Sequence, residues 1–495
     1  MRPETPLRAT LAVGVVAAAV PVLVGLPFLG RYGWDRDELY FLAASHHLAL
    51  GYVDFPPLLA LLGRAVVWAF GPSLDALRVS TAVIGASSAV FVALCAREVG
   101  GGLRAQAGAA AAWVTAPLLL GAASIFHPTW LDLAAQTATL YLVLVAAIRP
   151  APRVWIAVGV VAGLGLEAKY TIAVLLAALV AGFAATRRRE VFRRQGPWLA
   201  AALALLLLVP NIAWQVAHGW PSAEFSSSQR AKTADDTPPL TYLAQAFAFL
   251  AAGSVVAVIG TVWMWRRAVL RPFAIASVVV FVGFALERGR AYYPLPAMAL
   301  AVAAGAVALE RWRPARRGAR PAVVGALVVL QLALVAAATP IVVPVRTTAG
   351  MIQSGVWEDS FYKDEIGWPE LTAQTARAWR SLTPAARRHA AILARNYGEA
   401  GALAHFGPAL GLPPPLSGHL SWQYWRPSAL PERTLVTVGY DAATLRDMCA
   451  TFHRVATIEN RWRLGNEERG RTIDVCHLAG PLGAIWESRI ATNEL

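Results

Sequence analysis

The chain is dominated by long apolar runs that alternate with short segments rich in arginine. A helix that crosses a bilayer needs roughly 20 apolar residues. The runs predict eleven membrane-spanning helices, at residues 8–29, 76–96, 105–123, 131–148, 154–167, 170–186, 197–217, 241–265, 272–286, 292–309 and 321–341. The stretch 154–186 is divided because Glu167 and Lys169 interrupt it, which predicts two short helices that meet at a polar kink.

The placement of the arginines supports this division. With a cytoplasmic N-terminus, every cytoplasmic connection contains arginine, and Arg187-Arg188-Arg189 is the densest run. The opposite connections carry few cations and most of the acids. Because arginine and lysine are enriched in cytoplasmic loops, we expect a multi-pass protein of the inner (plasma) membrane with its N-terminus in the cytoplasm.

One apolar segment does not fit a simple span. Residues 56–72 are short, begin with Pro56-Pro57 and end with Gly71-Pro72. A full span there would invert every later loop, so we expect an interfacial or re-entrant helix inside a structured first outer loop at 31–75.

The character of the chain changes near residue 341. Beyond it no apolar run reaches spanning length, and charged and aromatic residues become common. We therefore expect an all-α polytopic membrane domain at 1–341 and an extracytoplasmic α/β domain at 342–495. Within the second domain we predict helices at 370–382 and 383–394, and strands at Thr434–Gly439 and Thr472–Cys476.

Composition agrees with a membrane protein, because 57% of the 495 residues are hydrophobic and only 15% are charged, against about 25% charged in soluble domains. The net charge of +14 does not indicate nucleic acid, since the basic clusters lie between apolar runs. The three cysteines lack metal-binding spacing. A disulfide between Cys449 and Cys476 is favoured if their domain faces an oxidising compartment, and two free thiols are the alternative. We expect Cys95 to pack inside a helix bundle.

Three carboxylates, Asp35, Asp37 and Glu38, follow the first predicted span. Acids desolvated together raise one another's pKa, which can prepare one of them as a general base. The alternative is a solvated loop in which an aspartate pairs with Arg36.

The segment 36–62, RDELYFLAASHHLALGYVDFPPLLALL, resembles the first outer loop of the GT-C-fold, polyprenyl-phosphate-sugar-dependent glycosyltransferases. That superfamily includes family 39, the protein O-mannosyltransferases and the lipid A aminoarabinose transferases. The shared features are the acidic pair Asp37-Glu38 and the Pro56-Pro57 step. Further similar segments are GLGLEAKYT (163–171), PNIAWQVAHGWP (210–221), GRAYYPLP (289–296), NYGEA (396–400) and SGH (417–419).

Two positions depart from the family pattern. Phe55 stands where lipid A-modifying members carry lysine, so a phosphate contact is absent there and specificity for lipid A is in doubt. Glu167 stands where a neutral residue is expected, and pairing with Lys169 is one account of it.

The resemblance implies transfer of a sugar, with inversion, from a polyprenyl-phosphate donor to an extracytoplasmic glycan, lipid or protein. Asp37 is the expected base, and Glu38 would orient it, a metal or the acceptor. Five residues are expected to bind the donor phosphate or sugar: Lys169, Arg288, Arg290, Tyr292 and Tyr293. For the lysine and the tyrosines, anchoring at the membrane interface is the alternative.

Asp132, Asp54 and His46 are further candidates for substrate contact. Capping of a helix by Thr129 or Asp132 is the simpler account of that segment. A metal site at His46-His47 and Asp54 is disfavoured because adjacent residues of a helix face different directions, although dependence on a divalent metal stays open. We expect the polar loop 218–240 to close over the site or touch the acceptor.

A polytopic lipid or sugar transporter, or flippase, is the alternative function. It predicts internal repeats and helices broken at the midplane, and the sequence shows neither clearly. The identities of the sugar and the acceptor, and the oligomeric state, are not encoded in recognisable residues.

Overall fold

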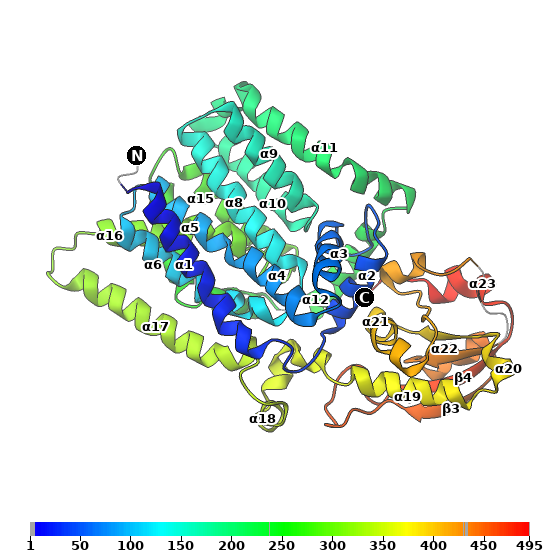
Figure 1. Cartoon of the computed structure of the whole chain (residues 1–495). Coiled ribbons are helices and arrows are strands. Elements are labelled where there is room, and N and C mark those ends of the chain that lie inside the picture. Colours follow the sequence, from blue (N-terminus) through cyan, green and yellow to red (C-terminus); the bar gives the residue numbers. More distant parts are fainter. Residues whose placement is uncertain (1–4, 237, 429, 431–433, 495) are drawn as a thin grey trace.

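The structure is a computed structural model that describes residues 5–236, 238–428, 430 and 434–494. A helical bundle forms its N-terminal part, and a small mixed region of helices and strands packs against one end of that bundle (Figure 1). The described bundle helices are α1 (Leu7–Gly25), α4 (Leu74–Ala86), α5 (Ser88–Glu98), α6 (Leu103–Val114), α7 (Pro117–Leu120), α8 (Pro128–Ile148), α9 (Pro152–Leu166), α10 (Thr171–Ala184), α11 (Gln195–Ala217), α13 (Pro239–Leu250), α14 (Gly253–Trp265), α15 (Arg271–Leu286), α16 (Ala299–Arg311) and α17 (Ala319–Val342).

Five predicted spans are present as helices long and apolar enough to cross a membrane. They are Leu7–Phe28, Leu74–Glu98, Pro128–Ile148, Gln195–Ala217 and Ala319–Val342. The stretch with Glu167 and Lys169 is divided into α9 and α10, as predicted.

The count of eleven spans is not confirmed, because the described residues give five spans, or up to eight if each of three bent helix pairs is one span. The predicted spans 105–123 and 241–265 are not continuous helices. The first is bent by 67° between α6 and α7, and the second by 97° between α13 and α14. The predicted span 292–309 begins as an irregular segment, and its α-helix starts only at Ala299. Broken helices, which the sequence did not reveal, are therefore part of this fold.

Three shorter helices lie at the end of the bundle that meets the C-terminal region. They are α2 (Arg36–His46), α3 (Leu58–Phe70) and α12 (Pro221–Asp236). The helix α3 is the short apolar helix predicted at 56–72, and Trp68 and Phe70 on it are exposed. This arrangement is compatible with an interfacial helix.

The C-terminal region contains a four-stranded sheet of order β1-β2-β4-β3. Its strands are β1 (Ala390–Ala394), β2 (Thr434–Val438), β3 (Cys449–Thr457) and β4 (Thr472–Leu478), and its helices are α18 (Thr348–Gln353), α19 (Trp368–Ser381), α20 (Pro384–Arg387), α21 (Tyr397–Phe406), α22 (Ala442–Met448) and α23 (Leu482–Ile485). β1 is parallel to β2, and the other two pairings are antiparallel. Both strands predicted from the sequence are confirmed, as is the helix at 370–382, whereas the helix predicted at 383–394 is wrong beyond Arg387, where β1 follows.

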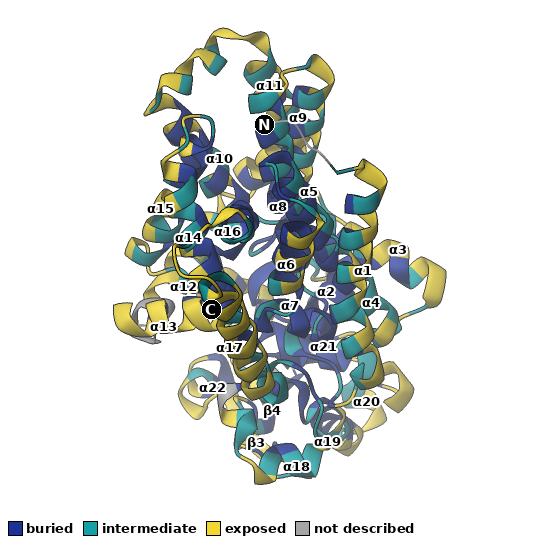
Figure 2. Cartoon of the chain, turned by 90° about the vertical axis from the view of Figure 1, so that its left-hand side faces the viewer, coloured by how far each residue is buried: buried dark blue, intermediate teal, exposed yellow. Residues whose placement is uncertain are grey.

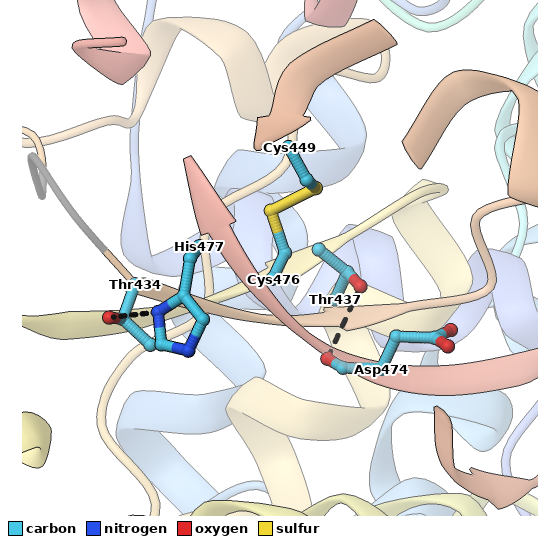
Figure 3. The surroundings of a disulfide bond; sticks show 6 residues. All are labelled: Thr434, Thr437, Cys449, Asp474, Cys476 and His477. Atoms are coloured by element: carbon cyan, nitrogen blue, oxygen red, sulfur yellow. Dashed lines mark hydrogen bonds between the residues drawn. A yellow bond between two sulfur atoms is a disulfide. The ribbon is translucent and has the colours of Figure 1, made fainter. Parts of the chain in front are cut away.

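A disulfide joins Cys449 at the start of β3 to Cys476 in β4, with Cα atoms 5.6 Å apart (Figure 3). The favoured pairing of these cysteines is therefore confirmed. Cys95 is free and buried, as expected.

The helix α21 lies directly against α2, and a glycine permits the close approach. A Cβ atom on Gly401 would lie 2.8 Å from Cβ of Leu39 and 3.0 Å from its carbonyl carbon. Such contacts are shorter than van der Waals distance, so any larger residue would push the helices apart. The C-terminal region is thereby fixed on the helix that carries Asp37.

Candidate active site

The first carboxylates of the outer loop form a helix cap. Asp35 precedes α2 and accepts a hydrogen bond from the backbone N–H of Asp37, while Glu38 accepts one from the backbone N–H of Asp35. This reciprocal capping box satisfies backbone donors at the start of α2. It fixes the direction in which the Asp37 side chain leaves the helix.

Glu38 does not face a cavity. Its carboxylate is fully buried and binds Arg78 of α4 through two hydrogen bonds of 2.8 and 2.7 Å. It also accepts the backbone N–H of Phe126 at 2.7 Å. Glu365 from the C-terminal region approaches the same arginine, with 3.4 Å between its Oε1 atom and Nη2 of Arg78. Glu38 therefore lines neither cavity, and its hydrogen bonds complete the capping box of α2 and join this helix to α4 and to Phe126.

Asp37 lies where two cavities meet. The first, which we call the helical-side cavity, has a volume of about 630 Å³, and the second, the sheet-side cavity, about 880 Å³. Asp37, Arg290 and Tyr397 line both of them. The hydroxyl of Tyr397 donates a hydrogen bond of 2.7 Å to Oδ1 of Asp37. Among the described residues, no protein group donates to Oδ2, so this oxygen is available to a ligand.

The helical-side cavity gathers the predicted phosphate-binding residues. Lys169, Arg288, Arg290, Tyr292 and Tyr293 all line it. They come from the α9–α10 connection and from the segment after α15, which the fold brings together. The same cavity has apolar walls that include Val174, Phe225 and Phe284.

Lys169 is held above the two tyrosine rings. Its Nζ atom lies 5.1 Å from the ring centroid of Tyr292 and 4.6 Å from that of Tyr293, and it donates to Oγ1 of Thr129 at 3.1 Å. None of these three partners is an anion, and the lysine makes no ion pair with Glu167 in the described part of the chain. An ammonium group with neutral partners in a partly buried cavity is well suited to bind an anion.

The sheet-side cavity is polar and carries both signs of charge. Its lining includes Arg36, Lys232, Lys363, Arg395 and Glu467, in addition to the three shared residues. Arg36 forms an ion pair with Glu467, with 2.5 Å between Nη1 and Oε2. The Cζ atom of Arg36 lies 4.8 Å from the ring centroid of Tyr397. Such a lining can hydrogen-bond the hydroxyl groups of a polar molecule.

Asp54 lies on the wall of the helical-side cavity, together with Asp37. Its Oδ1 accepts a hydrogen bond of 2.7 Å from the hydroxyl of Tyr40, and that hydroxyl in turn accepts the backbone N–H of Ser421. Burial raises the pKa of Asp54 to about 7. Asp54 therefore shares a cavity wall with Asp37 and Lys169.

Asp132 and His46 are not brought to the site. Asp132 is buried and accepts hydrogen bonds from Gln136 and from Thr171 at the start of α10, so it joins two helices. His46 is exposed at the far end of α2 and lines neither cavity. The cap of α8 is neither Thr129 nor Asp132 but His127, whose Nδ1 accepts the backbone N–H of Thr129.

The predicted polar loop 218–240 is largely the helix α12, which lies over both cavities. Ser222, Phe225 and Gln229 line the helical-side cavity, and Lys232 lines the sheet-side cavity. Gln229 accepts a hydrogen bond of 3.3 Å from the hydroxyl of Tyr293. The expected position of this loop over the site therefore agrees with the structure.

Three residues close to Asp37 were not among those predicted to belong to the site: Tyr397, Arg36 and Tyr40. Tyr397 belongs to the segment NYGEA, whose resemblance to family members was the only available signal, and its position beside Asp37 depends on a contact across 360 residues. No group of three or more His, Cys, Asp or Glu in the described part of the chain is arranged to hold a metal ion.

Comparison with known proteins agrees with this fold. Residues 54–214, a third of the chain, match the dolichyl-phosphate-mannose-protein mannosyltransferase family. No protein of curated function matches the sequence. The structure of ArnT from Cupriavidus metallidurans in the apo state is 16% identical, covers 94% of this chain and 97% of its own, and superposes with a TM-score of 0.60. The structure of ArnT from Cupriavidus metallidurans bound to undecaprenyl phosphate is also 16% identical. It covers 95% of this chain and 97% of its own, and it superposes with a TM-score of 0.56. The match over residues 54–214 and the fold shared with ArnT over nearly the whole chain both agree with the resemblance to the GT-C glycosyltransferases.

Proposed function

We propose that this chain, a relative of the GT-C glycosyltransferases, is an integral-membrane enzyme that transfers a sugar from a polyprenyl-phosphate donor to an extracytoplasmic acceptor. The observation that carries the proposal is the position of Asp37 at the junction of two cavities, one with cations and apolar walls and one with a polar lining. The undecaprenyl phosphate bound to an ArnT structure supports a donor of this class.

The donor occupies the helical-side cavity. Lys169 and Arg290 bind its phosphate, Tyr292 and Tyr293 donate hydrogen bonds to the phosphate or the sugar, and Arg288 attracts the phosphate at the exposed mouth. The apolar walls accommodate the first isoprene units. Cations next to the departing phosphate stabilise the negative charge that develops on it in the transition state.

The acceptor occupies the sheet-side cavity, and its hydroxyl reaches Asp37 from the side opposite the donor. Asp37 removes the hydroxyl proton as the oxygen attacks the anomeric carbon. The bond between that carbon and the phosphate oxygen breaks, and the polyprenyl phosphate leaves with the electron pair. A single displacement from the opposite face inverts the anomeric centre.

The other candidates receive different roles. Asp54 contacts the sugar or the acceptor from the cavity wall, and Tyr397 holds Asp37 in position. Glu38 is assigned to the buried ion pair that supports α2, and Asp132 to the junction of α8 and α10. His46 is assigned no role in the reaction.

The proposed orientation places the N-terminus in the cytoplasm, and the site and the region after residue 341 outside it. In this orientation 1–341 is the membrane domain and 342–495 is the extracytoplasmic domain. The arginine-rich connections then lie on the cytoplasmic side, which agrees with the usual distribution of positive charge.

The test uses purified full-length protein in lipid, radiolabelled polyprenyl-phosphate sugars and an extract of the bacterial envelope. We expect label to move to an acceptor with the wild type and with Asp75→Asn, which changes an exposed carboxylate of α4 that lines neither cavity. We expect no transfer with Asp37→Asn. Full transfer by the Asp37→Asn protein would contradict the assignment of the base.

A binding measurement tests the donor site separately from the chemistry. We expect Lys169→Met and Arg290→Gln each to weaken binding of undecaprenyl phosphate by about tenfold or more, since each removes a charge-assisted contact. The control Arg266→Gln, at a connection predicted to be cytoplasmic, should bind normally. Unchanged binding in both site variants would contradict the placement of the phosphate.

A further inference from the structure

A third cavity, which shares no lining residue with the other two, lies between α17 and the helices α6, α14 and α16. Its volume is about 460 Å³, and its lining is almost entirely apolar, with Gly108, Ala112, Val256 and Val328 as examples. We call it the α17 slot. The helix α17 stands away from the rest of the bundle, and most of its residues are exposed (Figures 1 and 2).

One end of the α17 slot is closed by hydrogen bonds. The side chain of Gln331 accepts the backbone N–H of Gly253 at 3.1 Å and donates to Oγ1 of Thr115 at 3.1 Å. These contacts attach the middle of α17 to α14 and to the end of α6. The slot therefore extends from this junction toward the N-terminal end of α17 only.

The other end is a basic mouth. Arg104 and Arg320 line it together with Glu310. The Glu310 carboxylate already accepts the backbone N–H groups of Gly102 and Ala105 at 2.9 and 3.3 Å. Arg320 donates to the backbone carbonyl of Glu310 at 2.8 Å, and no protein anion in the described part of the chain pairs with Arg104 or Arg320.

The length of the slot matches one leaflet of a bilayer. Its wall on α6 extends from Arg104 to Thr115, which at 1.5 Å per residue is about 16 Å, or half of a hydrocarbon core of roughly 30 Å. The mouth also lies at the opposite end of α1 from Asp37, because Gln106, near Arg104, donates a hydrogen bond to Oγ1 of Thr5. A long polyprenyl chain needs more than one leaflet, whereas an acyl chain of a phospholipid does not.

We propose that the α17 slot binds an anionic glycerophospholipid from the leaflet opposite the Asp37 site. One acyl chain lies between α17 and α6, and the phosphate lies between Arg104 and Arg320. The bound lipid supplies the packing that α17 lacks in its N-terminal half, so it fixes this helix against the bundle. The proposal is independent of the reaction catalysed at Asp37.

The test measures lipid binding to purified full-length protein in detergent, by native mass spectrometry and by the shift in melting temperature. Phosphatidylglycerol is the probe, and phosphatidylcholine is the zwitterionic comparison. We expect the anionic lipid to bind more tightly and to raise the melting temperature more. Arg104→Gln and Arg320→Gln should each weaken phosphatidylglycerol binding by about fivefold.

Two matched controls separate the slot from general lipid contact. Arg187→Gln with Arg189→Gln removes two exposed arginines at another connection and should leave the preference intact. Gly108→Leu fills the slot, whereas Gly325→Leu adds the same side chain on α17 outside it, and a Cβ atom at either glycine meets nothing within 4 Å. We expect only the Gly108 variant to lose the bound lipid.

Two results would overturn the proposal. One is an unchanged preference for phosphatidylglycerol in the double variant Arg104→Gln/Arg320→Gln or in Gly108→Leu. The other is displacement of phosphatidylglycerol from the wild type by undecaprenyl phosphate, which would identify a polyprenyl chain as the occupant.

Discussion

The hydroxyl of Tyr397, at the start of α21, donates a hydrogen bond of 2.7 Å to Oδ1 of Asp37, near the start of α2. The bond joins the C-terminal region to the proposed base and leaves Oδ2 of Asp37 without a donor among the described residues. Under the proposed function Tyr397 is a positioning residue, which would determine which oxygen of the carboxylate meets the acceptor hydroxyl.

Replacing Tyr397 by phenylalanine keeps the ring and removes the hydrogen bond. Hydrogen bonds to charged groups contribute about 1.5–3 kcal/mol, so we expect kcat to fall about tenfold to a hundredfold. The KM for the donor should change little, because Lys169 and Arg290 are untouched. Steady-state kinetics of Tyr424→Phe, at a tyrosine that lines neither cavity, provide the control. A rise in donor KM at constant kcat would refute the positioning role.

Replacing Asp37 or Glu38 by the corresponding amide should have different effects on the thermal stability of the protein. Glu38→Gln breaks a fully buried ion pair with Arg78, and breaking such a pair costs about 3–5 kcal/mol. We therefore expect a clear loss of thermal stability in Glu38→Gln, and little loss in Asp37→Asn, whose side chain is only half-buried. Melting curves of both variants in the same detergent make the comparison. Equal melting temperatures would show that Glu38 has no special structural role.

The raised pKa of Asp54 predicts a pH dependence of stability. Its folded-state pKa of about 7 lies above the ordinary aspartate value, so the folded chain favours the neutral acid. The contribution of Asp54 to the free energy of unfolding is therefore complete below about pH 4, and it is lost as the pH rises through 7. Asp54→Asn stays neutral, and between pH 5 and 8 it should gain on the order of 1–2 kcal/mol relative to the wild type. The measurement is the melting temperature of the wild type and of Asp54→Asn as a function of pH. If both melting temperatures changed with pH in the same way, the raised pKa of Asp54 would be contradicted.

The disulfide between β3 and β4 closes a loop with a sequence separation of 27. A crosslink of this length stabilises a chain by about 3 kcal/mol in the chain-entropy description. A reductant should therefore lower the melting temperature of the wild type and leave that of Cys449→Ala/Cys476→Ala unchanged. The buried thiol Cys95 serves as the control, since Cys95→Ala should remain sensitive to reductant.

Charge and apolar length were sufficient to predict five spans and the division at Glu167 and Lys169. The bend between α13 and α14 was not predictable in the same way. It occurs at Ala251, which adopts φ +52° without a proline or a charge at the bend. The strand β1 was also missed, because its alanine-rich sequence has local helix propensity and its conformation depends on pairing with β2, more than 40 residues later.

In the candidate site, too, some features follow from the local sequence, whereas others depend on contacts between segments that are far apart in the chain. Successive residues of a helix point about 100° apart, so when Asp37 faces the cavities, Glu38 faces the core. His46 lies nine residues after Asp37, about 14 Å along the helix axis, beyond reach of the site. Lys169 and Tyr292 are far apart in the sequence and meet only in the folded chain. Only the resemblance of their two segments to those of GT-C glycosyltransferases indicated that they belong to one site.

The buried cluster of Glu38, Arg78 and Glu365 joins residues that are made at very different times during synthesis. Arg78 and Glu38 emerge early from the ribosome, whereas Glu365 and Tyr397 emerge only after every described bundle helix has been made. Until then Arg78 lacks its second carboxylate, and Asp37 lacks the tyrosine that donates a hydrogen bond to it. A nascent chain already inserted in the membrane therefore has an incomplete candidate site, which is completed only when the C-terminal region has folded onto the bundle.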